Sequence, residues 1–287
     1  MIFNNEKHIK KTKFISFVLR SVTYFSAFAV FFVLLSVVVY ILVKSAMYVN
    51  LDFLNKNILN GKNMLATIIN TLYIIILALF FVLPIGIGTA IWLSKYSKKG
   101  IFSRVLHFTI EIFSGLPSLV LGLFGYDFFC IKLGMGTSII AGCLTMVLCT
   151  LPTIIKASEE AINSVPLTYE EASFSLGAGR AKTLRSATIP CAVPGIFTGI
   201  MLCIGKIAGE SAALIYTSGM MCKMPKNFFS HMFSSGRTLT LHLYQTVKQA
   251  NTDDSVAIAF LYALILLIFV FAINFFTNIT LNSIKNK

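Results

Sequence analysis

The sequence predicts an all-α polytopic membrane protein with six transmembrane helices. Hydrophobic residues make up 56% of the 287 residues and charged residues 12%, whereas a soluble domain of this size carries about 25% charged residues. Six apolar runs approach or exceed the roughly 20 residues that a helix needs to cross the hydrocarbon core. The net charge of +13 lies mostly between these runs, which is typical of membrane topology and not of a nucleic-acid-binding face.

The apolar runs differ in the charge that they carry. Runs 21–43, 64–94 and 133–155 are uncharged, and 64–94 is long enough to cross with tilt. Run 105–131 contains Glu111 and Asp127 near its ends, and run 187–216 contains two charged residues, Lys206 and Glu210. Run 255–284 is uncharged. It contains three asparagines spaced four apart, Asn274, Asn278 and Asn282, which form one polar stripe along a helix. We expect this stripe to face protein or the membrane interface.

Six spans place both chain ends on the same side of the membrane. Lys and Arg are more frequent in the N-terminal tail, in loops 94–104 and 156–185 and in the C-terminal tail than in the alternate loops. Basic residues concentrate on the cytoplasmic side, so this bias predicts that both termini are cytoplasmic.

A polar segment before the fifth span has the pattern of two short helices separated by glycines. Thr168-x-x-Glu171 fits a capping box at a helix start, and Gly177 and Gly179 allow the left-handed turn that ends a helix. Pro190 lacks an N–H and is expected at the start of the fifth span. A structured, charged hairpin between two spans indicates a docking surface for another protein.

This segment resembles the EAA motif of permease subunits in binding-protein-dependent ABC importers. The family pattern is E-A-A, three residues, G, nine residues and I-x-L-P. Here Glu171-Ala-Ser, Gly177 and Ala187-Thr-Ile-Pro190 keep the spacing, and the departures are small or apolar replacements at Ser173, Ala187 and Ile189.

The resemblance implies that the segment over 157–190 couples the chain to an ATP-hydrolysing subunit. The residues that match the motif would carry this coupling: Glu171, Ala172, Gly177 and Pro190. The alternative is that Glu171 only caps a helix and Gly177 only ends it.

Further stretches within 64–280 are similar to PstA-type permeases of phosphate importers. Residues 115–124 read G-L-P-S-L-V-L-G-L-F, where that group has G-I-P-S-I-V-x-G-L-F, and 205–212 read G-K-I-A-G-E-S-A, where it has G-R-A-x-G-E-T-A. The resemblance implies a type I ABC importer transmembrane fold with cytoplasmic coupling helices. Residues 1–63 would then form a tail, first helix and outer loop, 64–280 the permease domain, and 281–287 a cytoplasmic tail.

The same resemblance implies a set of partners in the bacterial cytoplasmic membrane. These are a second, PstC-like permease, a homodimeric PstB-like ATPase that uses ATP and Mg²⁺, and an extracytoplasmic PstS-like phosphate-binding protein. The chain has no G-x-x-x-x-G-K-[ST] loop, so we expect it to bind no cofactor and not to be an enzyme. Apolar residues in the loop over 217–254 are expected either to meet the binding protein or to pack over the spans: Met220, Met221, Met224, Phe228 and Phe229.

Four residues are candidates for a translocation path. Lys206 and Glu210 would share one helix face, and a charge inside a membrane faces either a partner or a water-filled path. Lys206 replaces the family's Arg, so it would attract phosphate as a point charge without a bidentate fork. An ion pair that locks two helices is the alternative. Ser114 and Ser118 flank Pro117, where freed backbone groups would need protein or water, and the small residues there also permit tight packing.

Other functions predict features that differ from these. A permease for another oxyanion, such as molybdate or sulfate, would share the coupling segment but not the phosphate-type third and fifth spans. A stand-alone secondary carrier or channel would not need the coupling segment. An intramembrane metalloprotease would need H-E-x-x-H, which is absent. The cysteines form no C-x-x-C pair, and no metal site or disulfide is predicted.

Overall fold

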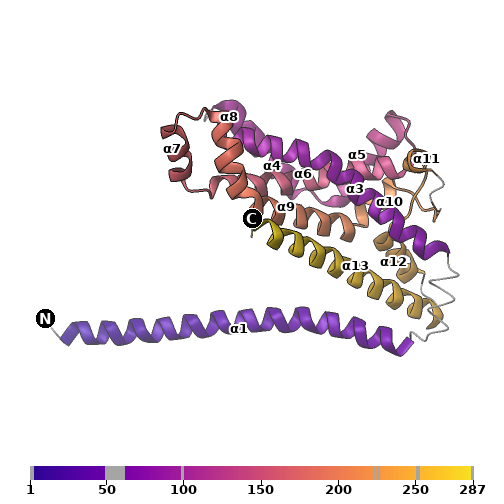
Figure 1. The fold of residues 1–287 in the computed structure, drawn as a ribbon. Coiled ribbons are helices and arrows are strands. Elements are labelled where there is room, and N and C mark those ends of the chain that lie inside the picture. Colours follow the sequence, from indigo (N-terminus) through magenta and orange to yellow (C-terminus); the bar gives the residue numbers. More distant parts are fainter. Residues whose placement is uncertain are drawn as a thin grey trace. The chain divides into compact units, whose positions relative to one another are not determined.

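The computed structural model describes residues 3–48, 62–97, 100–222, 224, 227–249 and 253–285. The described residues form helices joined by short connections, with no strand among them (Figure 1). The chain divides into two compact units, Met1–Asn50 and Leu51–Lys287. Most of the predicted loop over 44–63 lies outside the described residues, as do several basic residues of the topology prediction: Lys56, Lys98, Lys99, Lys223, Lys226 and Lys287.

The first unit is a single helix, α1 (Phe3–Tyr48). Its stretch from Thr12 to Tyr48 is long and apolar enough to cross a membrane. The apolar residues are spread around the whole circumference, which is typical of a helix surrounded by lipid. The predicted span over 21–43 is therefore confirmed as the middle of a longer helix.

The core of the second unit lies between three long helices. These are α3 (Lys62–Ile91), which continues through the π-helical turn η2 (Trp92–Tyr96), α6 (Ile139–Asn163) and α9 (Ile189–Gly209). Their facing sides are apolar and fully buried, as at Ala78, Cys143 and Cys203. A fourth long helix, α13 (Asp253–Lys285), runs beside them (Figure 1). Each of these four contains a stretch that is long and apolar enough to span a membrane.

The fourth predicted span begins and ends later than the sequence indicated. Gly134 and Gly136 adopt left-handed backbone angles with φ of 67° and 59°, which ends the preceding helix and turns the chain. The Ser138 side chain then accepts from the N–H of Ala141 at 3.4 Å and caps α6. The predicted range 133–155 was therefore wrong at both ends, and Lys156 lies inside α6 instead of in a loop.

The third predicted span, over 105–131, is broken at Pro117, where the sequence pattern predicted freed backbone groups. Helix α4 (Ile101–Gly115) ends before Leu116. The helical structure resumes as α5 (Ser118–Gly125) and continues as the π-helical η3 (Tyr126–Lys132). The two parts are bent by 102°. The cause is Pro117, because a proline pushes the residue before it out of the helical region, and Leu116 is accordingly extended.

The fifth predicted span is also interrupted. Helix α8 (Arg180–Thr183), the π-helical η4 (Leu184–Thr188) and α9 form one continuous helical run over Arg180–Gly209. The backbone is then extended at Glu210, and α10 (Ala212–Thr217) follows. The expected separate second helix of the polar segment is therefore the first part of the fifth span. Pro190 is the second residue of α9 and so lies at a helix start, as predicted, although η4 continues the helical run before it.

The second parts of the two broken spans, α5 and α10, pack directly on each other. A Cβ atom added at Gly122 of α5 would lie 2.7 Å from Ala213 Cα in α10. Backbone atoms cannot move aside as a flexible side chain can, so this contact requires glycine. The close approach holds α5 against α10.

We expect Gly122→Ala to destabilise the protein by about 1–3 kcal/mol, because an extra methyl group in a close-packed contact forces the two helices apart. The measurement is the thermal unfolding midpoint of the purified protein in detergent. Gly88→Ala is the matched control, since a Cβ at Gly88 in α3 has open space around it. Equal midpoints for the two variants would show that the α5–α10 contact yields without cost.

Short helices occupy both ends of the second unit. Helices α7 (Leu167–Ser175) and α8 lie at one end, and α11 (Phe228–Met232) and α12 (Leu239–Lys248) lie at the other (Figure 1). At the second end, buried Asn70 of α3 accepts from His231 Nε2 at 2.7 Å and donates to Arg237 O at 3.2 Å. This polar contact ties the chain after α10 to the second span.

Candidate functional site

Helix α7 is the centre of the polar segment over 157–190. It begins at Leu167 after Pro166, and no side chain caps it. The predicted capping box at Thr168 and Glu171 was therefore wrong, because the extended backbone before the helix lies at Pro166 and places Thr168 already within the first turn.

The end of α7 has the predicted glycine turn at Gly177, whose φ is +79°. The N–H of Gly177 bonds to Phe174 O at 2.9 Å, and the N–H of Ala178 bonds to Ser173 O at 3.1 Å. These two bonds form a Schellman motif, in which only glycine adopts the left-handed position without strain. Gly179 has an ordinary φ of −75° and does not share this role.

One face of α7 is open to solvent. Helical spacing places Thr168, Glu171, Ala172 and Ser175 on this face, and all four are exposed. Glu171 forms no ion pair within the described residues. The helix also carries exposed apolar groups at its two ends, with Leu167 at 67% and Leu176 at 89% exposure. This combination of an unpaired carboxylate, a small residue and apolar groups is suited to contact with another protein.

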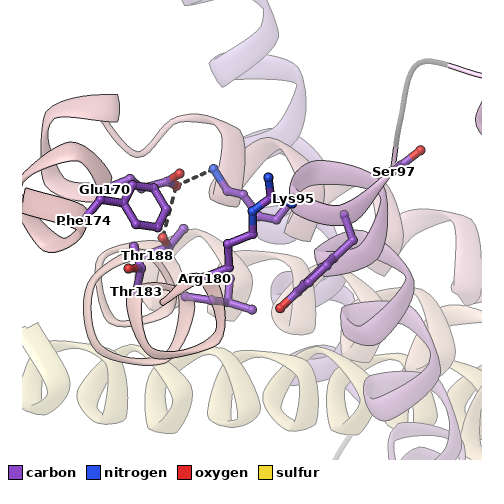
Figure 2. Close-up of a pocket in the computed structure, with 9 residues that line it drawn as sticks. Lys95, Ser97, Glu170, Phe174, Arg180, Thr183 and Thr188 are labelled. Carbon is purple, nitrogen blue, oxygen red and sulfur yellow. Dashed lines mark hydrogen bonds and ion pairs between the residues drawn. The ribbon is translucent and has the colours of Figure 1, made fainter. Parts of the chain in front are cut away.

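The opposite face of α7 is tied to the rest of the chain by polar contacts (Figure 2). Glu170 Oε1 lies 2.5 Å from Lys95 Nζ, and it accepts from Thr188 Oγ1 at 3.1 Å. The hydroxyls of Ser173 and Thr183 lie 2.9 Å apart. The sequence prediction missed Glu170 and Lys95, because only the fold brings the end of the second span to this helix.

A cavity of about 410 Å³ lies beneath this inner face (Figure 2). Its lining is mixed, with two cations, one carboxylate, aromatic rings and hydroxyl groups: Lys95, Tyr96, Ser97, Glu170, Phe174, Arg180, Thr183, Leu184 and Thr188. Helix α7 has no buried residue. Polar contacts across this cavity therefore hold the helix in place more than apolar packing does.

Lys206 and Glu210 do not form the predicted pair. Glu210 lies beyond the end of α9 with extended backbone, so the two side chains no longer share a helix face. Lys206 Nζ instead donates to Cys149 O at 2.8 Å, and Glu210 Oε1 accepts from the N–H of Ala213 at 3.2 Å. The carboxylate thus satisfies a free N–H at the start of α10, and the predicted structural ion pair was wrong.

The acceptor of Lys206 lies where α6 is weakened by a proline. Pro152 has no N–H, so the helical bond to Leu148 O cannot form and the turn before it is loosened. Cys149 O lies in this turn and accepts from Lys206, and the neighbouring Thr150 O is contacted by Cys203 Sγ at 3.8 Å. Both donors come from α9, so the loosened turn is also where the two helices meet.

A second cation, Lys156, lies on α6, the helix that accepts from Lys206. Lys156 Nζ donates to Ser114 Oγ at 3.0 Å, and Ser114 donates to Glu111 O at 2.9 Å. Lys156 is seven residues beyond Cys149, which is about 10 Å along a helix that rises about 1.5 Å per residue. Lys156, Lys206 and Ser114 are all exposed in this single chain. The structure thus places Ser114 with a lysine that the sequence prediction assigned to a loop.

Ser118 is the first residue of α5, directly after the break at Pro117. Val120 and Leu121 both donate their N–H groups to Pro117 O. The first turn of α5 thus begins at the break, where helix N–H groups attract negative charge. Leu116, in the same break, packs against the core that contains Cys149 and Ile207.

The remaining predicted apolar surface lies at the end with α11 and α12. Met220, Met221, Met224 and Phe229 are exposed, with Phe229 at 78%, whereas the side chain of Phe228 lies outside the described residues. The described residues contain no group of His, Cys, Asp or Glu placed to hold a metal ion. Met220 lines a groove beside α12 with Tyr244 and Lys248.

A histidine on α12 is held in its neutral form. Burial and the nearby Arg237 guanidinium lower the pKa of His242 from 6.5 to about 4. Arg237 Nη1 donates to His242 Nδ1 at 3.3 Å, Cys222 Sγ lies 3.6 Å from the same atom, and the ring lies against that of Tyr262. Protonation of Nδ1 would break these contacts.

We expect the stability of the protein to fall as the pH is lowered from about 6.5 towards 4, because the unfolded chain then binds a proton at His242 that the folded chain does not. Thermal unfolding in detergent between pH 7 and pH 4.5 measures this. His242→Gln keeps an acceptor for Arg237 and should reduce the pH dependence. An unchanged pH dependence in this variant would assign the effect to other groups, among them His231, whose pKa burial also lowers.

The described residues have the architecture of an all-α membrane protein, with several helices able to span a membrane, two broken spans and an exposed helix α7. The sequence profile of one family, the binding-protein-dependent transport system inner membrane component, matches residues 82–285. The chain belongs to this family, whose members are permease subunits of ABC importers.

Individual relatives and solved structures agree with the family. The probable ABC transporter permease protein YqgI of Bacillus subtilis (strain 168) is 31% identical over 232 residues, which are 77% of this chain and 79% of that protein. The phosphate transport system permease protein PstA homolog of Mycoplasma pneumoniae is 32% identical over 191 residues, which are 64% of this chain but only 29% of that longer protein.

The fold is shared with a solved importer. In an inward-facing structure of the MetNI methionine ABC transporter, one chain aligns with a TM-score of 0.58 and 18% identity, covering 77% of this chain and 94% of that chain. The all-α importer fold predicted from the sequence is therefore confirmed, with up to six spans if the bent pair counts as one.

Proposed function

We propose that the chain is one permease subunit of an ATP-driven phosphate importer in the bacterial cytoplasmic membrane. Both termini would be cytoplasmic. Its partners would be a second permease, a homodimeric ATPase and an extracytoplasmic phosphate-binding protein. The chain itself would bind no cofactor, and ATP and Mg²⁺ would be used by the ATPase.

The observation that supports coupling is the two-sided character of α7. Glu171 and Ala172 are exposed on one face, whereas Glu170 and Ser173 on the other face are bonded to the spans. A helix built in this way presents a surface to a partner while staying joined to the helices that must move. Gly177 ends the helix and keeps this surface short. Pro190 lies on a different element, and we assign it a part in shaping the fifth span, not in the contact.

Two observations support an anion as the cargo. Lys206 of α9 and Lys156 of α6 each present an ammonium group bonded to a single neutral oxygen. Neither has a carboxylate partner within the described residues, so both retain positive charge for an oxyanion. Ser114, Ser118 and the first turn of α5 would add neutral donors. Glu210 would contribute by holding the helix break open.

The phosphate relatives support phosphate in particular, and a direct transport measurement tests it. The four components are reconstituted in proteoliposomes, and ATP-dependent accumulation of radiolabelled phosphate is followed. Excess sulfate or molybdate is added as competitor. We expect no competition. Uptake that sulfate or molybdate abolishes would assign the cargo to that oxyanion, and uptake that persists without the ATPase would make the chain a secondary carrier or channel.

A further inference from the structure

The ion pair beneath α7 connects the exposed helix to two spans at once. Glu170 belongs to α7, Lys95 to the π-helical last turn of the second span, and Thr188 to the helical run of the fifth span. One carboxylate oxygen, Oε1, receives both contacts. The two ionic side chains are only 19% and 14% exposed, so water screens them less than it screens a surface pair.

Within the described residues, the ion pair with Lys95 is the direct charged contact of α7 with the second span. The helix has no buried residue, and the cavity of about 410 Å³ beneath it separates it from η2. The second hydroxyl contact, Ser173 with Thr183, reaches only the fifth span. The second span is packed into the core along its length, where Ala78, Val82 and Ala90 are fully buried. A displacement of α7 therefore reaches the second span directly through Lys95, and indirectly through α6 and the fifth span, which pack against Ala90.

We infer that Glu170 and Lys95 are positioning residues that transmit the movement of α7 to the second span during transport. This inference rests on the proposed docking of α7 against an ATPase. The pair differs in role from Glu171, which faces away from the chain and meets the partner. Loss of the pair would leave the docking surface intact but would let α7 move without the span.

The test measures how many phosphate ions are imported for each ATP hydrolysed by the complete complex in proteoliposomes. Glu170→Gln and Lys95→Gln should each lower this ratio about fivefold, and the exchanged double variant Lys95→Glu/Glu170→Lys should return it to within about twofold of the parent, as coupled neighbours do in a double-mutant cycle. Glu160→Gln is the control, since this exposed carboxylate at the end of α6 forms no ion pair within the described residues.

Two results would overturn the inference. One is a parental ratio in both single variants. The other is a parallel loss of assembled complex, ATP hydrolysis and uptake that the exchanged double variant does not restore. This result would show that the pair only stabilises the fold. If the parent complex hydrolyses ATP but imports no phosphate, the proposed cargo fails instead. The stimulation of ATP hydrolysis by the binding protein then serves as the readout, and it should weaken in the single variants and recover in the exchange.

Discussion

Glu171→Lys is expected to lower phosphate uptake by about 100-fold while leaving the amount of protein in the membrane unchanged. The side chain is exposed and has no ion-pair partner within the described residues, so its reversal does not disturb the contacts that hold α7. At a docked interface a reversed charge costs several kcal/mol, and each 1.4 kcal/mol or so is tenfold in an equilibrium constant. Uptake into cells or proteoliposomes, with immunoblots of the membrane fraction, measures the effect.

The control for this substitution is Glu160→Lys. Glu160 is also an exposed carboxylate, but it lies on α6 outside the docking helix. We expect uptake in this variant to stay within about twofold of the parent, as for most surface substitutions. Normal uptake in Glu171→Lys would remove the docking role of α7. Loss of the variant from the membrane would show instead that Glu171 is needed for folding.

Lys206→Met is expected to lower uptake at least about tenfold, because it removes the positive charge proposed to attract the oxyanion and keeps the apolar stem. The substitution also removes the donor to Cys149 O. A hydrogen bond from a charged group contributes about 1.5–3 kcal/mol, so stability is measured alongside uptake by the thermal midpoint in detergent.

Lys206→Arg separates the two effects of this lysine. It restores charge and a donor, so we expect it to regain most of the uptake, and the family pattern has Arg at this position. If Lys206→Met keeps its uptake and loses only stability, Lys206 is a structural donor between α9 and α6. If Lys206→Arg is as inactive as Lys206→Met, charge alone does not account for the role of this position.

Of the two helix breaks, the local sequence pattern indicated one and missed the other. Pro117 with its flanking small residues indicated a disturbed helix, and the chain does break there. No proline lies at the break after Gly209, so the sequence pattern did not indicate it. At this break Glu210 leaves the helix, and its side chain accepts from an N–H at the start of α10. This N–H belongs to Ala213, and Ala213 also packs against Gly122 of α5, so this break depends on contacts that are not local along the chain.

The sequence by itself determined the membrane class, the long apolar helices, the glycine turn at Gly177 and the resemblance to importer permeases. The first three follow from composition, periodicity and spacing, and the resemblance rests on sequence motifs; all of these are local along the chain. The tertiary structure alone placed Lys95 against Glu170, Lys156 against Ser114 and Lys206 against Cys149 O. Each pair joins residues that are 42 or more positions apart, and only the packing of the helices brings such residues together.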